Sequence, residues 1–303
     1  MKYTWINDLK AEVTIKKLLT VKGVSHRILS RVKRGEGEVW LEGKKSNLTQ
    51  KVAIAEHVTL GLIPENNPAI LPAVGALKIL FEDQNWLVVD KPAGITSVPG
   101  PSNRKSTLVN RIKGYLMAQG AQDLVPHIIT RLDRDTSGIV LVAKNRLAQG
   151  LIGKQTEKQQ LQKRYLAVIS GRLPQQHGLI EACIGRQDKQ IKREVTAAGQ
   201  FAKTEYWVLD ESSGTTLVEV KLHTGRTHQI RVHFSAIGCP LLGDELYGGD
   251  LNKGITRQAL HAFKLNYLDP FTLQKNACTA ALPDDMQALC SHLGLDILTS
   301  QRE

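Results

Sequence analysis

Four charged residues lie together in one short segment of the chain: Arg131, Asp133, Arg134 and Asp135. The apolar run 138–143 follows and is rich in Val and Ile, which is typical of a strand buried on both faces. A loop at the mouth of such a strand can hold a functional side chain on a rigid support. Neighbouring arginines favour the ionised form of a carboxylate, so a charged acid is expected here. The alternative is a solvated turn whose charges only pair with one another.

Other motifs that would carry chemistry are missing from the sequence. It contains neither the P-loop pattern Gly-x-x-x-x-Gly-Lys-Ser/Thr nor the Gly-x-Ser-x-Gly of α/β-hydrolases. His228 and His233 are five residues apart on a predicted helix and should face different ways, whereas paired metal ligands favour a spacing of four. Asp133 and Asp135 could hold Mg²⁺ for phosphodiester chemistry, but the sequence shows no third acid beside them. A metal-dependent nuclease is therefore kept as an alternative, while no metal or cofactor is expected.

The overall charge indicates a polyanionic partner. The 303 residues carry a formal net charge of +11, which favours nucleic acid ahead of a membrane surface. No apolar run approaches the ~20 residues of a transmembrane helix, and the first residues lack the apolar stretch of a signal peptide. The four cysteines are scattered and form no Cys-x-x-Cys, as expected for reduced thiols. We therefore expect a cytoplasmic protein that does not enter a membrane.

Residues 1–62 are predicted to form a small basic domain. Its first 60 residues hold twelve Lys and Arg against six Asp and Glu, a net charge of +6. Helices are expected at 14–19 and 25–34, the second with Ser25 as N-cap. Arg27, Arg31 and Arg34 share one face of that helix and could follow a phosphate backbone, although a solvated face is the alternative. With the hairpin 38–45, which carries Lys44 and Lys45, this arrangement resembles an S4-type RNA-binding module.

A linker at 63–76 and a second domain at 77–303 are predicted to follow. Pro64, Pro68 and Pro72 disfavour helix and interior strand, so the linker should be semi-extended. In the second domain, strands outnumber helices and do not alternate with them. This favours an α+β fold with a mixed, largely antiparallel sheet flanked by helices. Strands are expected at 77–81, 86–89, 138–143, 163–170, 178–184, 201–209, 215–222, 258–265 and 271–273, and helices at 106–117, 146–161, 227–238 (with Thr227 as cap) and 284–293.

Four ordered motifs in this second domain resemble those of one enzyme family. They are Leu-Val-Val-Asp-Lys-Pro-Ala-Gly at 87–94, Arg-Leu-Asp with Thr-Ser-Gly at 131–138, Lys-Arg-Tyr at 163–165, and Thr-Gly-Arg-Thr-His-Gln-Ile-Arg-Val-His at 224–233 with Leu-Gly-Asp at 242–244 and Leu-His-Ala at 260–262. Together they make the chain similar to the RluA-type pseudouridine synthases, and to the RluD-like subgroup that has an N-terminal S4-like domain.

The resemblance assigns roles to four residues. Asp133 matches the catalytic aspartate, Tyr165 the tyrosine that lies against the target uracil, and Arg231 the arginine that pairs with the catalytic carboxylate. Arg131 matches an arginine that fills the space left in the RNA by the extruded base. Two positions depart from the family pattern. Thr130 stands where a His usually precedes Arg-Leu-Asp, and the opening motif continues as Ser97-Val-Pro99, where many members have a His before the Pro.

The chemistry of pseudouridine formation is consistent with these residue types. The reaction breaks a C–N glycosidic bond, rotates the base and makes a C–C bond, so an ionised carboxylate can form a covalent intermediate and no cofactor is required. A stacked uracil must first be flipped out and received by an aromatic face. We therefore expect an RNA pseudouridine synthase acting on structured RNA, with 23S ribosomal RNA the first candidate, transfer RNA the second, and a monomer as the default state.

An alternative of a different class is a non-catalytic RNA-binding or ribosome-assembly factor of the same fold. Such a protein would be expected to have lost at least one of Asp133, Tyr165 and Arg231, and this sequence keeps all three.

Overall fold

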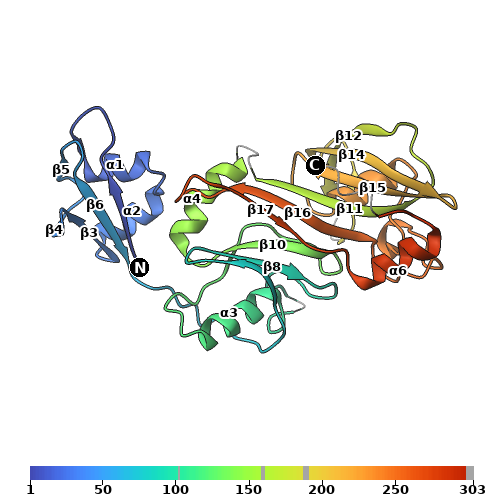
Figure 1. Cartoon of the computed structure of the whole chain (residues 1–303), viewed down its shortest axis with the longest axis horizontal. Helices are drawn as coiled ribbons and strands as arrows, with labels where there is room; N and C mark the ends of the chain where they lie inside the picture. The colour runs from blue at the N-terminus through green and yellow to red at the C-terminus, as the bar shows by residue number, and fades with distance from the viewer. Residues whose placement is uncertain (102, 158–160, 187–190, 298–303) are drawn as a thin grey trace.

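The computed structural model describes residues 1–101, 103–157, 161–186 and 191–297. The first 62 residues form a small unit at one end of the molecule (Figure 1). Two helices pack on an antiparallel sheet with the strand order β1-β6-β3-β4, and β2 pairs with β5. The elements of this unit are β1 (Lys2–Ile6), β2 (Val13–Thr14), α1 (Ile15–Val21), α2 (His26–Lys33), β3 (Gly37–Leu41), β4 (Lys44–Ser46), β5 (Lys51–Val52) and β6 (His57–Leu62).

Both N-terminal helices begin at residues whose side chains cap them. Ser25 Oγ accepts the backbone N–H of Ile28 at the start of α2, as predicted, and Thr14 does the same for α1. Strand β1 is not predicted from the sequence pattern. Only Tyr3 of this segment is buried, so its alternation is weak, and its regular pairing with β6 depends on residues more than fifty positions away.

One large mixed sheet dominates the rest of the chain. Its strands follow the order β13-β12-β14-β15-β11-β16-β10-β8-β7, with β17 beside β16 and β9 beside β10. Only the pair β10 and β16 is parallel among the described strands, which confirms the prediction of a mixed, largely antiparallel sheet. The strands are β7 (Lys78–Glu82), β8 (Trp86–Lys91), β9 (His127–Ile128), β10 (Ser137–Ala143), β11 (Gln162–Ser170), β12 (His177–Arg186), β13 (Arg193–Val195), β14 (Gln200–Ser212), β15 (Thr215–Leu222), β16 (Leu260–Leu268) and β17 (Lys275–Thr279).

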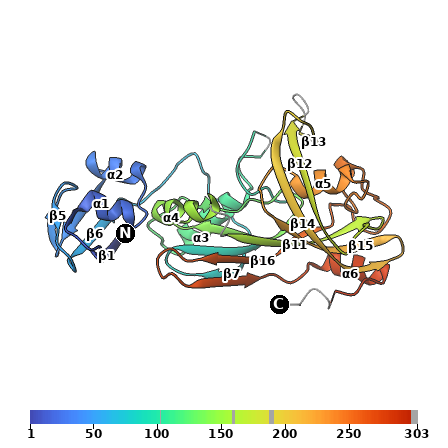
Figure 2. The same ribbon diagram turned by 90° about the horizontal axis from the view of Figure 1, so that it is seen from above.

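Helices cover both faces of this sheet. On one face, α3 (Leu108–Ala118) and α5 (Gln229–Ala236) pack against the alternate buried residues of β8, β10, β11 and β15. On the other face, α6 (Asp284–Leu293) covers β11 and β15. Figure 2 shows the arm of β12, β13 and β14 rising on the side that carries α5, with α6 on the opposite side.

Helix α4 (Arg146–Glu157) is shared between the two parts of the molecule. Its Ala148 and Ile152 pack against the large sheet, whereas Leu147 and Leu151 are buried in the core of the N-terminal unit. The helix predicted at 146–161 is thus present up to its described end, and residues 158–160 lie outside the described residues. Two adjacent pairs of residues, four positions apart, each give one side chain to either core, which explains why this helix can join the units.

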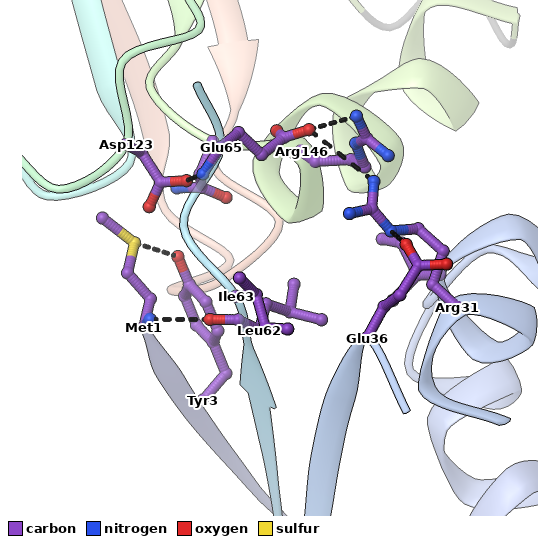
Figure 3. Close-up of a pocket in the computed structure, with 11 residues that line it drawn as sticks. Met1, Tyr3, Arg31, Glu36, Leu62, Ile63, Glu65, Asp123 and Arg146 are labelled. Atoms are coloured by element: carbon purple, nitrogen blue, oxygen red, sulfur yellow. Dashed lines mark hydrogen bonds and ion pairs between the residues drawn. The ribbon is translucent and has the colours of Figure 1, made fainter. Parts of the chain in front are cut away.

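The segment 63–76 contains no helix or strand, but it is fastened to the large domain. Glu65 lies at its start with a side chain only 8% exposed, and this carboxylate ion-pairs with Arg31 and Arg146 (Figure 3). It also ion-pairs with His127 at 2.9 Å. The backbone N–H of Glu65 donates to Asp123 Oδ1 at 2.9 Å. The adjoining cavity measures about 20 Å³, which leaves room for a single water molecule and no larger ligand.

Two local predictions are wrong. Residues 271–273 are not a strand but a turn between β16 and β17, in which Asp269 accepts the N–H of Phe271 and Leu273 is left-handed with φ 58°. The apolar Phe271 is explained instead by its stacking on Tyr3 of the N-terminal unit, with ring centroids 5.3 Å apart. Likewise, Thr227 does not cap α5, because the helix begins after His228.

Candidate active site

The loop that carries Asp133 connects β9 to β10 and is fastened by buried side chains. Ser97 Oγ donates to the carbonyl of Leu132 at 2.7 Å and accepts its N–H at 3.1 Å. Lys91, which is fully buried, donates from Nζ to three backbone carbonyls, one of them that of Arg134 at 3.0 Å. Burial lowers the pKa of Lys91 to about 7. These bonds hold the loop on both sides of Asp133, as a reactive side chain requires.

Gly138 allows the loop to lead directly into the parallel strand pair. Its φ is 111°, and a Cβ atom here would lie 2.2 Å from the carbonyl oxygen of Ala262 on β16. Only glycine therefore lets β10 and β16 approach at this point. Beside it, Ser137 Oγ is hydrogen-bonded to Nδ1 of the fully buried His261 at 2.9 Å.

A cleft of about 810 Å³ opens above this loop. It is lined by the Asp133 loop, by the start of β11 and by the segment 222–231, which leads into α5. The structure thus brings together four residues predicted from three separate motifs, since all of them line this cleft: Arg131, Asp133, Tyr165 and Arg231. Its volume lies within the range of pockets that bind small ligands.

Arg231 is held mainly by a second carboxylate. Its Nε and Nη2 donate to the two oxygens of Asp244 at 2.7 and 2.8 Å, while Nη1 lies 3.4 Å from Asp133 Oδ2. The guanidinium also lies over the ring of Tyr247, 4.8 Å from its centroid. Burial alone would lower the pKa of Arg231, but the hydrogen bonds and charge of Asp244 raise it. A fixed positive charge is therefore presented to Asp133 without fully neutralising it.

The side chains of Tyr165 and Arg131 differ in burial. Tyr165, at a bulge in β11, is 3% exposed and packs in the same core cluster as Leu132. Arg131 is exposed, and its side chain has no hydrogen-bond or ion-pair partner among the residues that the structure describes. Thr130 is buried, and its Oγ1 accepts the N–H of Leu141 at 2.9 Å, so its hydroxyl fastens the loop to β10.

The predicted RNA-binding residues of the N-terminal unit lie away from the cleft. Arg27 and Lys44 are exposed, and Lys45 is exposed with Glu38 as an ion-pair partner at 2.5 Å. Arg34 pairs with Glu36 at 3.0 Å but keeps 63% of its side chain exposed. Arg31 differs, because it is bound by Glu36 at 2.9 Å and faces Glu65 at 3.9 Å in the junction between the two parts (Figure 3).

Three residues around the cleft have no role predicted from the sequence. Asp244 stands in the quoted Leu-Gly-Asp motif, but nothing local indicates that it would bind Arg231. Tyr247 closes the short 3₁₀ turn Glu245–Tyr247 and contacts both Arg231 and His228. His228 lies 3.9 Å from Asp133, whereas His233 is buried against Thr204, so the two histidines do face different ways. The one signal in the sequence for a role of His228 is its place between the turn at Gly225 and the start of α5.

Two further properties bear on the class of protein. Within the described residues, no group of three His, Cys, Asp or Glu side chains could hold a metal ion. In the same part of the chain, no helix is long and apolar enough to cross a membrane.

Asp135, the second acid of the loop, pairs with the neighbouring Arg134 at 3.0 Å.

Known proteins resemble this chain in both sequence and fold. The profile of the RNA pseudouridylate synthase family matches residues 85–236. YjbO, an RNA pseudouridine synthase of Bacillus subtilis, is 38% identical over 91% of this chain and 98% of its own length. Ribosomal large subunit pseudouridine synthase D of Nitrosomonas europaea is 35% identical over 87% of this chain and 81% of its own. The structure of human RNA Pseudouridylate Synthase Domain Containing 4 shares the fold, with a TM-score of 0.61 and 24% identity over 73% of this chain and 94% of that one. The chain therefore belongs to the RluA family of RNA pseudouridine synthases and is an enzyme of the isomerase class.

Proposed function

We propose that this enzyme converts specific uridines of large-subunit ribosomal RNA to pseudouridine, with Asp133 as its nucleophile. The observation that carries the proposal is the pairing of Asp133 with Arg231 in the cleft, where Asp244 holds the guanidinium. Support for the substrate comes from the Nitrosomonas europaea relative, whose name assigns it to the large ribosomal subunit.

The proposed reaction uses the residues of the cleft and nothing else. The carboxylate of Asp133 bonds to C1′ as the C1′–N1 bond breaks with its electron pair on the base. After the base rotates, C5 bonds to C1′ and the bond between C1′ and the Asp133 oxygen breaks, which frees the carboxylate. The proton leaves C5 and N1 gains a proton. No net oxidation or hydrolysis takes place.

Two other residues are proposed to prepare the nucleotide for this reaction. Tyr165 lies in the wall of the cleft and would receive the uracil against its ring, where it can also assist removal of the C5 proton. Arg131, exposed at the rim, would enter the space that the flipped base leaves. The cost of flipping is a few kcal/mol, which phosphate contacts at a basic surface can offset.

The N-terminal unit is proposed to bind RNA outside the cleft, as an S4-like module. Its exposed cations at Arg27, Arg34, Lys44 and Lys45 are available to phosphates. Arg31 is expected to contribute less than its position on the helix suggests, because two carboxylates already face its guanidinium.

The proposal is tested by release of tritium from uridine labelled at C5. Unmodified large-subunit ribosomal RNA and transfer RNA are incubated separately with the enzyme in excess EDTA. We expect release from the ribosomal RNA and little from transfer RNA. Release from transfer RNA alone would refute the substrate, and loss of release in EDTA would favour metal chemistry.

A non-catalytic assembly factor, the alternative kept from the sequence, is disfavoured because the chain belongs to a family of enzymes. It predicts tight binding of ribosomal RNA and no tritium release from any RNA. Such a factor would be expected to have lost at least one of Asp133, Arg231 and Tyr165, and all three line one cleft.

A further inference from the structure

His228 has a strained backbone for which the helix gives no reason. It precedes α5 as the N-cap residue, with φ 58° and ψ 20°, a left-handed conformation that costs a non-glycine residue about 1–2 kcal/mol. Its side chain makes no capping hydrogen bond to the helix. Instead the imidazole, which is 11% exposed, turns into the cleft toward Asp133. A strained backbone that the local structure does not require is typical of functional positions.

Hydrogen bonds to Tyr247 determine which nitrogen of His228 carries the proton. The backbone N–H of Arg193 donates to Tyr247 Oη at 2.9 Å, and the same oxygen lies 2.9 Å from His228 Nδ1. Since Oη already accepts from Arg193, we assign its own hydrogen to the bond with Nδ1. Burial lowers the pKa of His228 more than the charge of Asp133 raises it, so the ring is neutral at pH 7. The remaining proton is therefore on Nε2, on the side of Asp133.

Two donors thus face the same oxygen of Asp133. Arg231 Nη1 lies 3.4 Å and His228 Nε2 lies 3.9 Å from Oδ2. Within the described part of the chain, Oδ1 has no such partner. The two oxygens are therefore not equivalent, and the one without a donor is the better nucleophile.

We propose that His228 is a positioning residue, whose Nε2–H acts with Arg231 to hold Oδ2 so that Oδ1 of Asp133 faces the bound nucleotide. This inference rests on the proposed function of Asp133. The present distance from Nε2 to Oδ2 is too long for a hydrogen bond, and we expect it to shorten when RNA fills the cleft and excludes water. Tyr247 acts one step further away, by fixing the tautomer of the imidazole.

A pair of isosteric variants tests the position of the donor. In His228→Gln, the amide nitrogen takes the place of Nε2 and keeps the donor. In His228→Asn, the amide reaches only as far as Nδ1, although Asn tolerates a left-handed backbone well. We expect kcat for tritium release to fall about 100-fold in His228→Asn and no more than about fivefold in His228→Gln. The KM for RNA should stay within about twofold in both, because the contact joins two side chains of the enzyme and does not bind the RNA itself.

Tyr247→Phe tests the same inference independently, because it removes the hydroxyl that orients His228 and keeps the ring over Arg231. We expect kcat to fall about tenfold, while Tyr267→Phe, at another buried tyrosine outside the cleft, should have no effect. Adding Tyr247→Phe to His228→Gln should cost no further activity, because the tyrosine hydroxyl then has no imidazole to orient. Thermal unfolding and RNA affinity are measured for every variant.

The outcomes separate this inference from the proposed function. An active wild type with equally active His228→Asn overturns the role of His228 and leaves the function intact. Equal losses in the Gln and Asn variants, or a change in KM alone, also overturn it. A wild type inactive on every RNA overturns the proposed function, and the inference fails with it.

Discussion

Replacing Asp244 by Asn should separate the two partners of Arg231. The substitution keeps the shape of the side chain but removes the charge and turns one of two acceptors at 2.7 and 2.8 Å into a donor. Asp244 is 1% exposed and Arg231 8% exposed, so the guanidinium is left buried with its main partner gone. Such a loss costs about 3–5 kcal/mol, and the remaining contacts to Asp133 and Tyr247 favour the lower end. With an unfolding entropy of about 2 cal/mol/K per residue over 303 residues, 3 kcal/mol corresponds to a fall in Tm of about 5 °C.

The same variant should also slow catalysis. Without Asp244, the closest carboxylate to Arg231 is Asp133, and a direct pair between them would neutralise the nucleophile. We expect kcat to fall about 100-fold with little change in KM, measured by tritium release and by thermal unfolding. Asp285→Asn is the matched control, because it breaks a similar two-bond pair with Arg257 at 2.6 and 2.8 Å whose carboxylate is 45% exposed. That pair should be worth at most about 1 kcal/mol. Equal effects of both substitutions, or a normal kcat in Asp244→Asn, would refute the reasoning.

Three further predictions concern stability. Burial lowers the pKa of His261 to about 4, so the neutral ring adds its full contribution to the free energy of unfolding above pH 6.5 and loses it as the pH falls to 4. Urea unfolding should therefore show a loss of roughly 3 kcal/mol in acid, and His261→Gln should lack this loss. Glu65→Gln should loosen the junction, and proteolysis within 63–76 should accelerate; unchanged cleavage would contradict its role as the shared anion. Gly138→Ala, which places Cβ 2.2 Å from the oxygen of Ala262, should destabilise the fold by more than about 3 kcal/mol, whereas Gly153→Ala, in open space on α4, should stabilise it slightly; similar effects would rule out the close approach.

The sequence pattern predicts those helices and strands that are determined by residues within the element itself. Helix α2 has its cap at Ser25, and β10 is a short apolar run buried on both faces, so both were found close to their true bounds. The segment 271–273 has the apolar character of a strand, but Phe271 serves a contact with Tyr3 that is 268 positions away in the chain. Strand β1 is not predicted, because its sequence alternates only weakly and the strand is formed by pairing with the distant β6.

The candidate site shows the same division. Asp133, Tyr165 and Arg231 were identified from their motifs, and the fold places them around one cleft. Which carboxylate holds Arg231 depends on the turn that follows α5, and no spacing in the sequence expresses that geometry. Arg31 shows the limit of helix periodicity, since its neighbours on the helix face are exposed while it turns toward Glu65 from another segment.

The most direct test of the central claim compares the two acids of the loop, Asp133 and Asp135. Asp133→Asn removes the proposed nucleophile, while Asp135→Asn removes a carboxylate two positions away that pairs only with its neighbour Arg134 among the described side chains. Both variants are assayed with enzyme in excess over C5-tritiated ribosomal RNA. We expect no detectable release from Asp133→Asn at unchanged RNA affinity, and release within about threefold of wild type from Asp135→Asn. Release by Asp133→Asn at the wild-type rate would contradict the assignment of the nucleophile.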